Sequence, residues 1–345
     1  MSKVLIIGPN YFNFNQSVKR AFENLNWTVV VEGYDTPIHP FTTLLKWKRK
    51  FSPNREKLWT QQATKFNQFV AERFTEIAPN LVFVLNGEIL FTETLDFFRK
   101  TAKVAVWTYD AISRFPKARK HIDHCDAMFC YEKQDVDDFS AQGKTAYFLP
   151  QACDETLYFL DPQSPEKDID ILFIGVLYNY QKRIELLKSV VKSFPNKKIL
   201  IIGKYKPFEK NPLKWLFREK RNIYTNRNIP FEQVNAYYNR AKVVLNIHHE
   251  TQTYGANPKV FEICGAGTYQ ICDANPFIET LFPNNEIGLY HNEKELITLI
   301  EEALKSVGFQ KPNKFDKAAT SARKIMFSEH TFTQRIAFML NKLKI

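Results

Sequence analysis

Short apolar runs recur along this chain, and each is followed by a polar or glycine residue and then by a longer amphipathic segment. The run Val4-Leu5-Ile6-Ile7 ends at Gly8 and predicts a buried strand, and residues 14–25 after it predict a helix. Strands that are apolar throughout, rather than alternating, are typical of parallel sheets covered by helices on both faces. The repeat therefore points to the α/β class with doubly wound sheets.

The same pattern runs twice along the chain, six strands and then five. The expected strands are Val4–Ile7, Thr28–Val31, Leu81–Leu85, Val104–Thr108, Ala127–Tyr131 and Ala146–Leu149, then Ile169–Ile174, Ile199–Ile202, Val243–Ile247, Tyr269–Cys272 and Ile287–Tyr290. Between the two series, residues 161–167 are polar and contain two prolines, which predicts a linker. We expect two Rossmann-like domains facing across a cleft. The first domain is expected at 1–150, a junction at 151–168 and the second domain at 169–325. We expect a C-terminal helix at 326–345 to pack back toward the first domain.

Charge is distributed unevenly along the chain. The net charge is +11, but residues 182–242 alone hold 16 basic and 4 acidic residues. A field of this kind attracts an anionic partner such as a phosphate, a membrane surface or a nucleic acid. A solvated basic face is the alternative interpretation.

The cysteines and the length of the apolar stretches indicate the cellular compartment. Five cysteines with no CxxC spacing argue against a disulfide framework or a zinc ribbon, and they fit a reducing compartment. No apolar stretch is long enough to cross a bilayer, and the N-terminus lacks the pattern of a signal peptide. We therefore expect a cytoplasmic protein.

The segment from Asn257 to Gly267 carries the clearest chemical pattern. Asn257 predicts the N-cap of a helix, and the proline after it suits the first helical position. The free N–H groups and positive dipole of such a helix end favour a phosphate. Lys259 and Glu262 share one helix face, which offers a cation for a diphosphate and an acceptor for ribose hydroxyls. Gly265 and Gly267 then allow a tight turn, although an ordinary capped helix would show the same features.

A family resemblance extends beyond this segment. The further segments that carry it are Phe148–Asp154, Asp170–Gly175 with Arg183, Tyr237–Lys242, Ala241–Ile247 and His330–Arg335. Together they resemble bacterial glycosyltransferases of the spore-maturation type, a branch of the two-Rossmann (GT-B) glycosyltransferases. The resemblance covers residues 145–340, and the first domain fits only by its general pattern.

The resemblance implies that the second domain binds a nucleotide-sugar donor, with Glu262 at the ribose-binding position. Lys259 stands where the family often has arginine, which keeps the charge but loses bidentate geometry. Related retaining enzymes often carry another glutamate eight positions earlier, but here that position is Tyr254 and Glu250 lies too early. Whether the sugar keeps its configuration therefore stays open.

Other candidates for the donor site follow predicted strands. The loop after Gly175 opens a helix and carries Lys182 and Arg183, two cations that could meet a diphosphate without a metal. The full set of expected donor-binding residues is Gly175, Tyr178, Lys182, Arg183, Lys204, His248, Asn257, Lys259, Glu262, Gly265 and Gly267. Any single cation in it could instead be a solvated residue at a helix end.

The first domain is expected to bind the acceptor and to supply a general base. Asp110 and Glu88 follow predicted strands and are our candidates, ahead of Asn10 and Asp35. Turn carboxylates commonly cap helices, which is the alternative for each. We expect the acceptor to be a hydroxyl of a glycan or a lipid-linked glycan, as in cell-surface polysaccharide synthesis.

Metal and cofactor chemistry is not expected. His121, His124, Cys125 and Cys130 resemble a ligand cluster but span a helix end and a strand, so their side chains should diverge. Asp168 and Asp170 have the Asp-x-Asp spacing of metal-dependent glycosyltransferases, but they lie at the amino end of a predicted strand. Ligands are expected at the carboxyl end, so this pair does not predict a metal site.

Two basic and aromatic stretches, 44–51 and 212–221, suit an anionic membrane surface. Aromatic side chains packed in the core beneath snorkelling cations are an equal alternative. Two other functions compete with sugar transfer. One is a catalytically inactive nucleotide- or glycan-binding protein of the same fold. The other, less favoured, is a basic nucleic-acid-binding protein, for which no recognition helix is visible.

Overall fold

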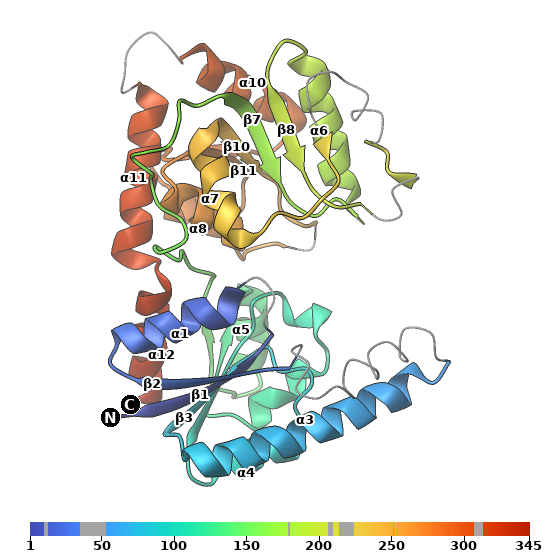
Figure 1. Cartoon of the computed structure of the whole chain (residues 1–345), viewed down its shortest axis with the longest axis vertical. Coiled ribbons are helices and arrows are strands. Elements are labelled where there is room, and N and C mark those ends of the chain that lie inside the picture. Colours follow the sequence, from blue (N-terminus) through green and yellow to red (C-terminus); the bar gives the residue numbers. More distant parts are fainter. Residues whose placement is uncertain are drawn as a thin grey trace. The chain divides into compact units, whose positions relative to one another are not determined.

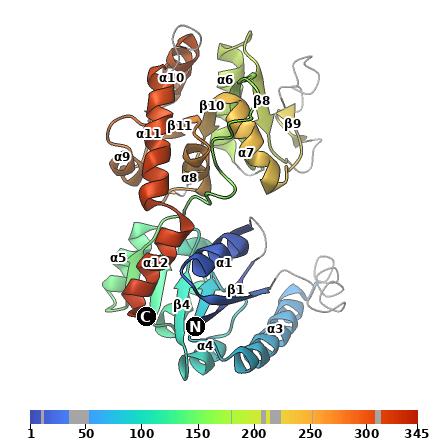
Figure 2. The same ribbon diagram turned by 60° about the vertical axis from the view of Figure 1, so that its left-hand side comes forward.

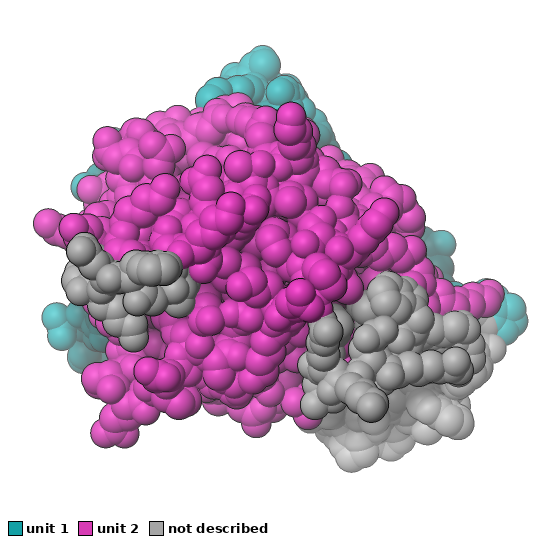
Figure 3. All heavy atoms as spheres, turned by 90° about the horizontal axis from the view of Figure 1, so that it is seen from above, with its two compact units in different colours: residues 1–150, 332–345 teal, residues 151–331 magenta. Residues whose placement is uncertain are grey.

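The computed structural model describes residues 1–9, 13–34, 53–178, 180–205, 210–213, 224–250, 252–306 and 313–345. The chain divides into two compact units (Figure 3): unit 1 is residues 1–150 and 332–345, and unit 2 is residues 151–331. Each unit holds one six-stranded sheet with helices on both faces (Figure 1). The expected pair of doubly wound α/β folds is confirmed.

The sheet of unit 1 has the order β2-β1-β3-β4-β5-β6, and all neighbouring strands are parallel. The strands are β1 (Lys3–Gly8), β2 (Thr28–Gly33), β3 (Leu81–Leu85), β4 (Lys103–Trp107), β5 (Ala127–Cys130) and β6 (Ala146–Phe148). Val4 to Ile7 of β1 are fully buried. Burial on both faces explains why this strand reads as a continuous apolar run.

Helices cover both faces of this sheet (Figures 1 and 2). They are α1 (Phe14–Asn24), α3 (Arg55–Ile77), α4 (Thr92–Arg99), α5 (Lys133–Ser140) and α12 (Phe332–Leu343), with short 3₁₀ helices η2 (Ile112–Arg114) and η3 (Ala118–Asp123). In α3, Phe66, Val70 and Phe74 are spaced four residues apart and so share one face. That face packs in the core with side chains of β1 and β3.

The helix α12 comes from the far end of the sequence but packs against α1. The rings of Phe14 and Phe332 meet edge to face with centroids 6.0 Å apart. The Asn24 Nδ2 atom donates a hydrogen bond of 3.1 Å to Thr333 Oγ1. Unit 1 is therefore built from two separate pieces of sequence.

The boundary of unit 1 is marked by a buried arginine in α12. Arg335 Nε donates to the carbonyl of Pro150 at 3.1 Å, and burial lowers the pKa of this guanidinium to about 10. The sequence placed the boundary at residue 326, but the structure places it after Thr331. The reason is that α11 (Lys314–Glu329) spans residue 326 and buries its apolar face in the cores of unit 2.

The sheet of unit 2 has the order β12-β11-β10-β7-β8-β9, again all parallel. The strands are β7 (Ile169–Ile174), β8 (Ile199–Ile202), β9 (Tyr224–Thr225), β10 (Ala241–Asn246), β11 (Tyr269–Asp273) and β12 (Gly288–Tyr290). The sequence pattern did not reveal β9. With only two residues, it is too short to show a period.

Two separate apolar cores lie on the two faces of this sheet. The helices are α6 (Gln181–Ser193), α7 (Phe231–Arg240), α8 (Pro258–Gly265), α9 (Pro276–Leu281), α10 (Glu293–Lys305) and α11. Helices α6 and α10 cover one face, while α7, α8 and α9 cover the other (Figure 2). Helix α11 contributes to both cores, Ala319 to the first and Ala322 to the second.

Some predictions concern residues that the structure does not describe. Asn10, Asp35, the stretch 44–51 and most of 212–221 lie outside the described residues. Within the described part of the chain, none of the helices combines the length and the apolar character needed to span a bilayer.

Candidate functional site

The candidate site of unit 2 lies where the winding of its sheet reverses. The chain leaves β7 toward β8 and β9, then crosses back to β10, β11 and β12 on the other side. In doubly wound sheets the carboxyl ends of the strands at this reversal leave a crevice that binds ligands. Here that edge is formed by the residues after β7, β8, β10 and β11, which we call the unit 2 edge.

Two glycines bring the strands of this edge close together. A side chain on Gly203, after β8, would place its Cβ only 2.1 Å from the carbonyl oxygen of Gly175. The backbone N–H of Gly175 donates to the carbonyl of Ile202 at 2.9 Å, which fixes the distance between the ends of β7 and β8. Gly203 is therefore required by packing, and the candidate Gly175 lies at the start of the β7–α6 loop.

Arg183 in α6 is buried and clamps this loop from within. Its Nε donates to the carbonyl of Ile247 at 3.2 Å, and its Nη1 donates to the carbonyl of Val176 at 2.6 Å. The guanidinium also lies 4.2 Å from the ring centroid of Tyr180, and burial lowers its pKa. The side chain thus joins the β7–α6 loop to the end of β10, and its contact with a diphosphate stays a prediction.

Lys182, the neighbour of Arg183, is exposed at the N-terminus of α6. Its Nζ lies 3.4 Å from Asp273 Oδ2, and its backbone N–H donates to Glu250 Oε1 at 3.3 Å. Tyr178 in the loop is 47% exposed and meets Tyr205 edge to face at 5.7 Å. Lys204 directly precedes Tyr205 in the sequence and is half-buried. The unit 2 edge therefore carries two lysines and an aromatic pair, of which Tyr178 is exposed and Tyr205 is half-buried.

Asn257 caps α8 as expected, and a network of amides fixes the cap. Its Oδ1 accepts the backbone N–H of Val260, and its Nδ2 donates to Asn246 Oδ1 at 2.9 Å. Asn246 donates in turn to Asn257 Oδ1 at 3.1 Å and to Gln270 Oε1 at 2.9 Å. Because Gln270 Nε2 also donates to the carbonyl of Val260, β10, β11 and α8 are joined through side chains.

His248 links this cap to Asp273 at the end of β11. The backbone N–H of Asn257 donates to His248 Nε2 at 3.2 Å, so the ring proton lies on Nδ1. Nδ1 then donates to Asp273 Oδ1 at 2.8 Å. Burial alone would raise the pKa of Asp273, but its bonds to His248 and the nearby Lys182 lower it to about 2. The imidazole of His248 thereby positions the N-terminus of α8.

His248 and Asp273, together with Cys272, form the one group in the described part of the chain that could hold a metal ion. Both ring nitrogens of His248 are already hydrogen-bonded, and burial raises the pKa of the Cys272 thiol. A metal would need the thiolate and a free imidazole nitrogen. The group therefore fits a hydrogen-bonded cluster better than a metal site.

Glu262 lies in the second turn of α8 between two tyrosines. The hydroxyls of Tyr158 and Tyr238 both donate to its carboxylate, Tyr238 to Oε2 at 3.4 Å. Burial raises the pKa of Glu262, and Lys259 and the two hydroxyls offset part of this rise. Since an ionised carboxylate accepts about four hydrogen bonds, Glu262 can accept more than these two.

The two later glycines lie at the other end of α8, away from Asn257. A Cβ on Gly265 would lie 2.4 Å from Cys153 Sγ, so this position packs against the chain before β7. Gly267 has φ +72°, the left-handed region that favours glycine, and forms the turn into β11. Packing explains Gly265 and backbone conformation explains Gly267, and neither lies at the helix N-terminus.

The two candidate bases lie at the carboxyl edge of unit 1. Asp110, after β4, accepts the backbone N–H of Ala111 at 2.9 Å and forms an ion pair with Arg114. Glu88, after β3, is half-buried, and its carboxylate accepts the backbone N–H of Lys117. Burial raises the pKa of Glu88, and Lys117 lowers it in part.

The histidines and cysteines discounted as a metal cluster contact different parts of unit 1. His121 Nε2 lies 3.3 Å from the carbonyl of Leu90, and His124 Nδ1 lies 2.9 Å from the carboxylate of Asp96. Cys125 and Cys130 are buried free thiols.

Sequence reasoning missed several residues that support the candidate donor site. They are Asn246, Gln270, Asp273, Tyr158 and Tyr238. Asp273 directly follows a predicted strand, so the rule that selected Asp110 would also have found it. No local pattern marks the two tyrosines, because Tyr158 is 104 positions from Glu262 in the sequence.

Residues 182–341 match a protein family described as glycosyl transferase-like. This range includes the N-termini of α6 and α8, Glu262, His248 and most of α12. No curated protein matches the chain at a significant level.

Solved structures share the fold along nearly the whole chain. Sucrose-phosphate synthase from Thermosynechococcus elongatus has a TM-score of 0.69 at 12% identity, covering 99% of both chains. The N-terminal domain of Candida albicans trehalose-6-phosphate phosphatase has a TM-score of 0.69 at 11% identity, covering 100% of this chain and 97% of that chain. Anabaena HepE in complex with UDP and glucose has a TM-score of 0.65 at 13% identity, covering 99% of this chain and 100% of that chain. The chain therefore has the GT-B fold.

Proposed function

We propose that this chain is a glycosyltransferase that moves a sugar from a nucleotide-diphosphate sugar to a hydroxyl of a glycan or a lipid-linked acceptor. The family match over residues 182–341 supports this, as does HepE, a protein of the same fold that binds UDP and glucose. The observation that carries the proposal is the capped N-terminus of α8 at the reversal of the unit 2 sheet, beside Lys182 and His248. We also propose the spore-maturation branch, on the residues quoted above.

The unit 2 edge would bind the donor. The N-termini of α6 and α8 direct backbone N–H groups toward this edge, and Lys182 and Lys204 add positive charge for a diphosphate. Charge that grows on the leaving phosphate is stabilised best by donors already fixed in place. The bonds among Asn246, Asn257 and His248 give α8 that rigidity. Glu262 would accept the ribose hydroxyls.

Unit 1 would supply the base that takes the proton from the acceptor hydroxyl. Of the two candidates, Glu88 fits better, because a raised pKa brings a carboxyl closer to the working pH of a general base. Asp110 is the second candidate, because its carboxylate already forms an ion pair with Arg114. We propose that transfer needs no metal, because lysines and helix N-termini supply the positive charge.

We propose that the enzyme works at the inner face of a membrane, on the ground of the basic and aromatic stretches 44–51 and 212–221. Sedimentation with anionic and neutral vesicles tests this. Binding to neither kind would contradict it.

A thermal-shift panel with UDP, GDP, ADP, TDP and CMP tests donor binding. We expect one diphosphate to raise the apparent stability of the wild type by ~2.7 kcal/mol at a hundredfold excess over its dissociation constant. Glu262→Gln should lose most of this shift, because an amide offers fewer acceptor sites to ribose. Glu232→Gln, an exposed glutamate in the first turn of α7, is the matched control.

The outcomes separate the candidate functions. If no nucleotide shifts the wild type, sugar transfer is contradicted. If a nucleotide binds but the matching nucleotide sugar is neither transferred nor hydrolysed, the chain is an inactive nucleotide-binding protein of the same fold.

A further inference from the structure

We propose that a cavity at the carboxyl edge of unit 1 binds the acceptor, and that this acceptor is a sugar carrying an anionic group, either a phosphate or a carboxylate. The inference rests on the proposed function, since it names the second substrate of the same reaction.

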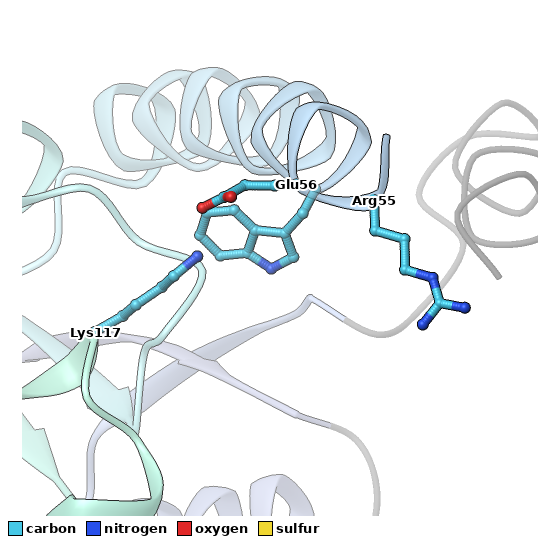
Figure 4. Close-up of a pocket in the computed structure, with 4 residues that line it drawn as sticks. Arg55, Glu56 and Lys117 are labelled. Atoms are coloured by element: carbon cyan, nitrogen blue, oxygen red, sulfur yellow. The ribbon is translucent and has the colours of Figure 1, made fainter. Parts of the chain in front are cut away.

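The cavity has a volume of about 410 Å³ and is lined by Arg55, Glu56, Trp59 and Lys117 (Figure 4). Small-molecule sites usually span roughly 300–1,000 Å³, so the volume suits one or two sugar rings. Three of the four residues come from the first turns of α3, and the fourth comes from the segment between η2 and η3. We call this space the unit 1 cavity.

The topology places the cavity where an α/β sheet binds ligands. Helix α3 connects β2 to β3, and because these strands are parallel, the N-terminus of α3 lies at their carboxyl edge. Lys117 lies in the connection from β4 to β5 and so belongs to the same edge. The winding of this sheet reverses between β1 and β3, and α3 crosses that reversal.

Lys117 gives the cavity its anion-binding character. Its Nζ lies 3.2 Å from the centroid of the Trp59 ring, and Figure 4 shows the side chain of Lys117 extended toward the helix that carries Glu56. Among the residues that the structure describes, no carboxylate oxygen lies within the 4.0 Å of an ion pair from this nitrogen. An ammonium that rests on an aromatic face keeps its N–H donors available to an entering anion.

The remaining groups suit the rest of a sugar. Trp59 packs on the core of unit 1, which holds in place the indole that carries the Lys117 ammonium. Glu56 offers acceptors for sugar hydroxyls, and Arg55 adds a second cation at the N-terminus of α3. The cavity thus combines two cations, one carboxylate and one aromatic ring.

The cavity also adjoins the better candidate base. The carboxylate of Glu88 accepts the backbone N–H of Lys117, so the residue that would hold the anionic group also holds Glu88. A sugar anchored at Lys117 therefore has a carboxylate beside it that can accept a hydroxyl proton.

Calorimetric titration of the full chain, saturated with the nucleotide found in the panel above, tests the inference. The probes are glucose 6-phosphate, glucuronate, glucose and inorganic phosphate. We expect one of the two anionic sugars to bind at least tenfold more tightly than both glucose and inorganic phosphate. Which of the two binds identifies the anionic group.

Lys117→Gln should weaken binding of that sugar about tenfold, and Trp59→Leu should weaken it by a similar factor. Lys120→Gln, an exposed lysine of the adjoining η3, should leave it unchanged. Arg55→Gln is a second test in case the Lys117 variant loses its fold.

The inference is overturned if glucose binds as tightly as the anionic sugars, if no sugar binds, or if well-folded Lys117→Gln and Arg55→Gln both bind like the wild type. Nucleotide binding that persists while sugar binding fails contradicts this inference alone. A chain that binds no nucleotide contradicts the proposed function instead.

Discussion

The two sheets share one architecture, but their carboxyl edges are built differently. In unit 2, side chains from separate elements bond to each other, as Asn246 does with Asn257 and His248 with Asp273. In unit 1, Asp110 pairs with Arg114 four residues along the chain, and the side chains that cross between elements bond to backbone groups, as Asn67 does with Ile89 and Asp135 with Ile112.

The difference separates a rigid edge from an adaptable one. A fully bonded network of side chains holds one geometry before any ligand arrives. Separate bonds to backbone groups impose less on the neighbouring side chains than a network does, and unit 1 keeps an open cavity at its edge. We infer that unit 2 suits an invariant ligand part, such as a diphosphate, whereas unit 1 can change its ligand through few substitutions.

The largest expected effect is a loss of stability when a glycine at a close contact in each edge is replaced by alanine. Gly203→Ala should destabilise unit 2 by about 3 kcal/mol, because the new Cβ would meet the Gly175 carbonyl, which the sheet holds in place. Gly8→Ala in unit 1 should cost less, about 2 kcal/mol, since the nearest atom met, Asn15 Oδ1, ends a side chain that can turn aside, although Leu85 Cβ cannot. Urea unfolding followed by hydrogen exchange in each unit measures both. Equal losses would contradict the comparison.

Acid should weaken unit 1 before unit 2. Burial lowers the pKa of His121 from 6.5 to about 4, so the unfolded state binds its proton first and stability falls as the pH drops through this window. The loss is about 3 kcal/mol. Asp273 has a pKa of about 2 against 3.8 unfolded, so its contribution to unit 2 of about 2 kcal/mol is lost only between these values.

Hydrogen exchange of both units between pH 7 and pH 3, corrected for intrinsic rates, checks this order. His121→Gln should flatten the pH dependence of unit 1 alone. Earlier loss of protection in unit 2 would show that other groups control acid stability.

The smallest effect should appear in binding rather than in stability. Lys182→Ala should weaken binding of the nucleotide diphosphate about tenfold, because one cation near the phosphates is removed. Stability should change by less than ~0.5 kcal/mol, since this lysine is exposed. Lys192→Ala, at the other end of α6, is the matched control. Equal affinities in both variants would remove Lys182 from the proposed donor site.

The sequence predicted those features that depend on local pattern. Eleven of the twelve strands were expected because burial on both faces makes each one an apolar run. The cap at Asn257 was expected because an asparagine before a proline is a local helix-start signal.

Features that depend on distant partners were not predictable. Arg183 and Lys182 are adjacent, and only the packing decides that one side chain turns inward to Ile247 while the other stays exposed. Gly265 was expected from its place at a tight helix end, but the atom that excludes a side chain there belongs to Cys153, 112 positions away in the sequence. The bonds of Glu262 to Tyr158 and Tyr238 likewise join segments that no periodicity connects.

The origin of α12 affects how the protein forms during synthesis. Unit 2 is encoded between Pro150 and Phe332, so a ribosome finishes it before it starts the helix that α1 packs against. At about 5–20 residues per second, the first 150 residues wait roughly 10–40 s for that helix. During this interval the apolar face of α1 that will receive Phe332 lacks its partner. The nascent first unit is therefore the stage at which we expect chaperone dependence and aggregation.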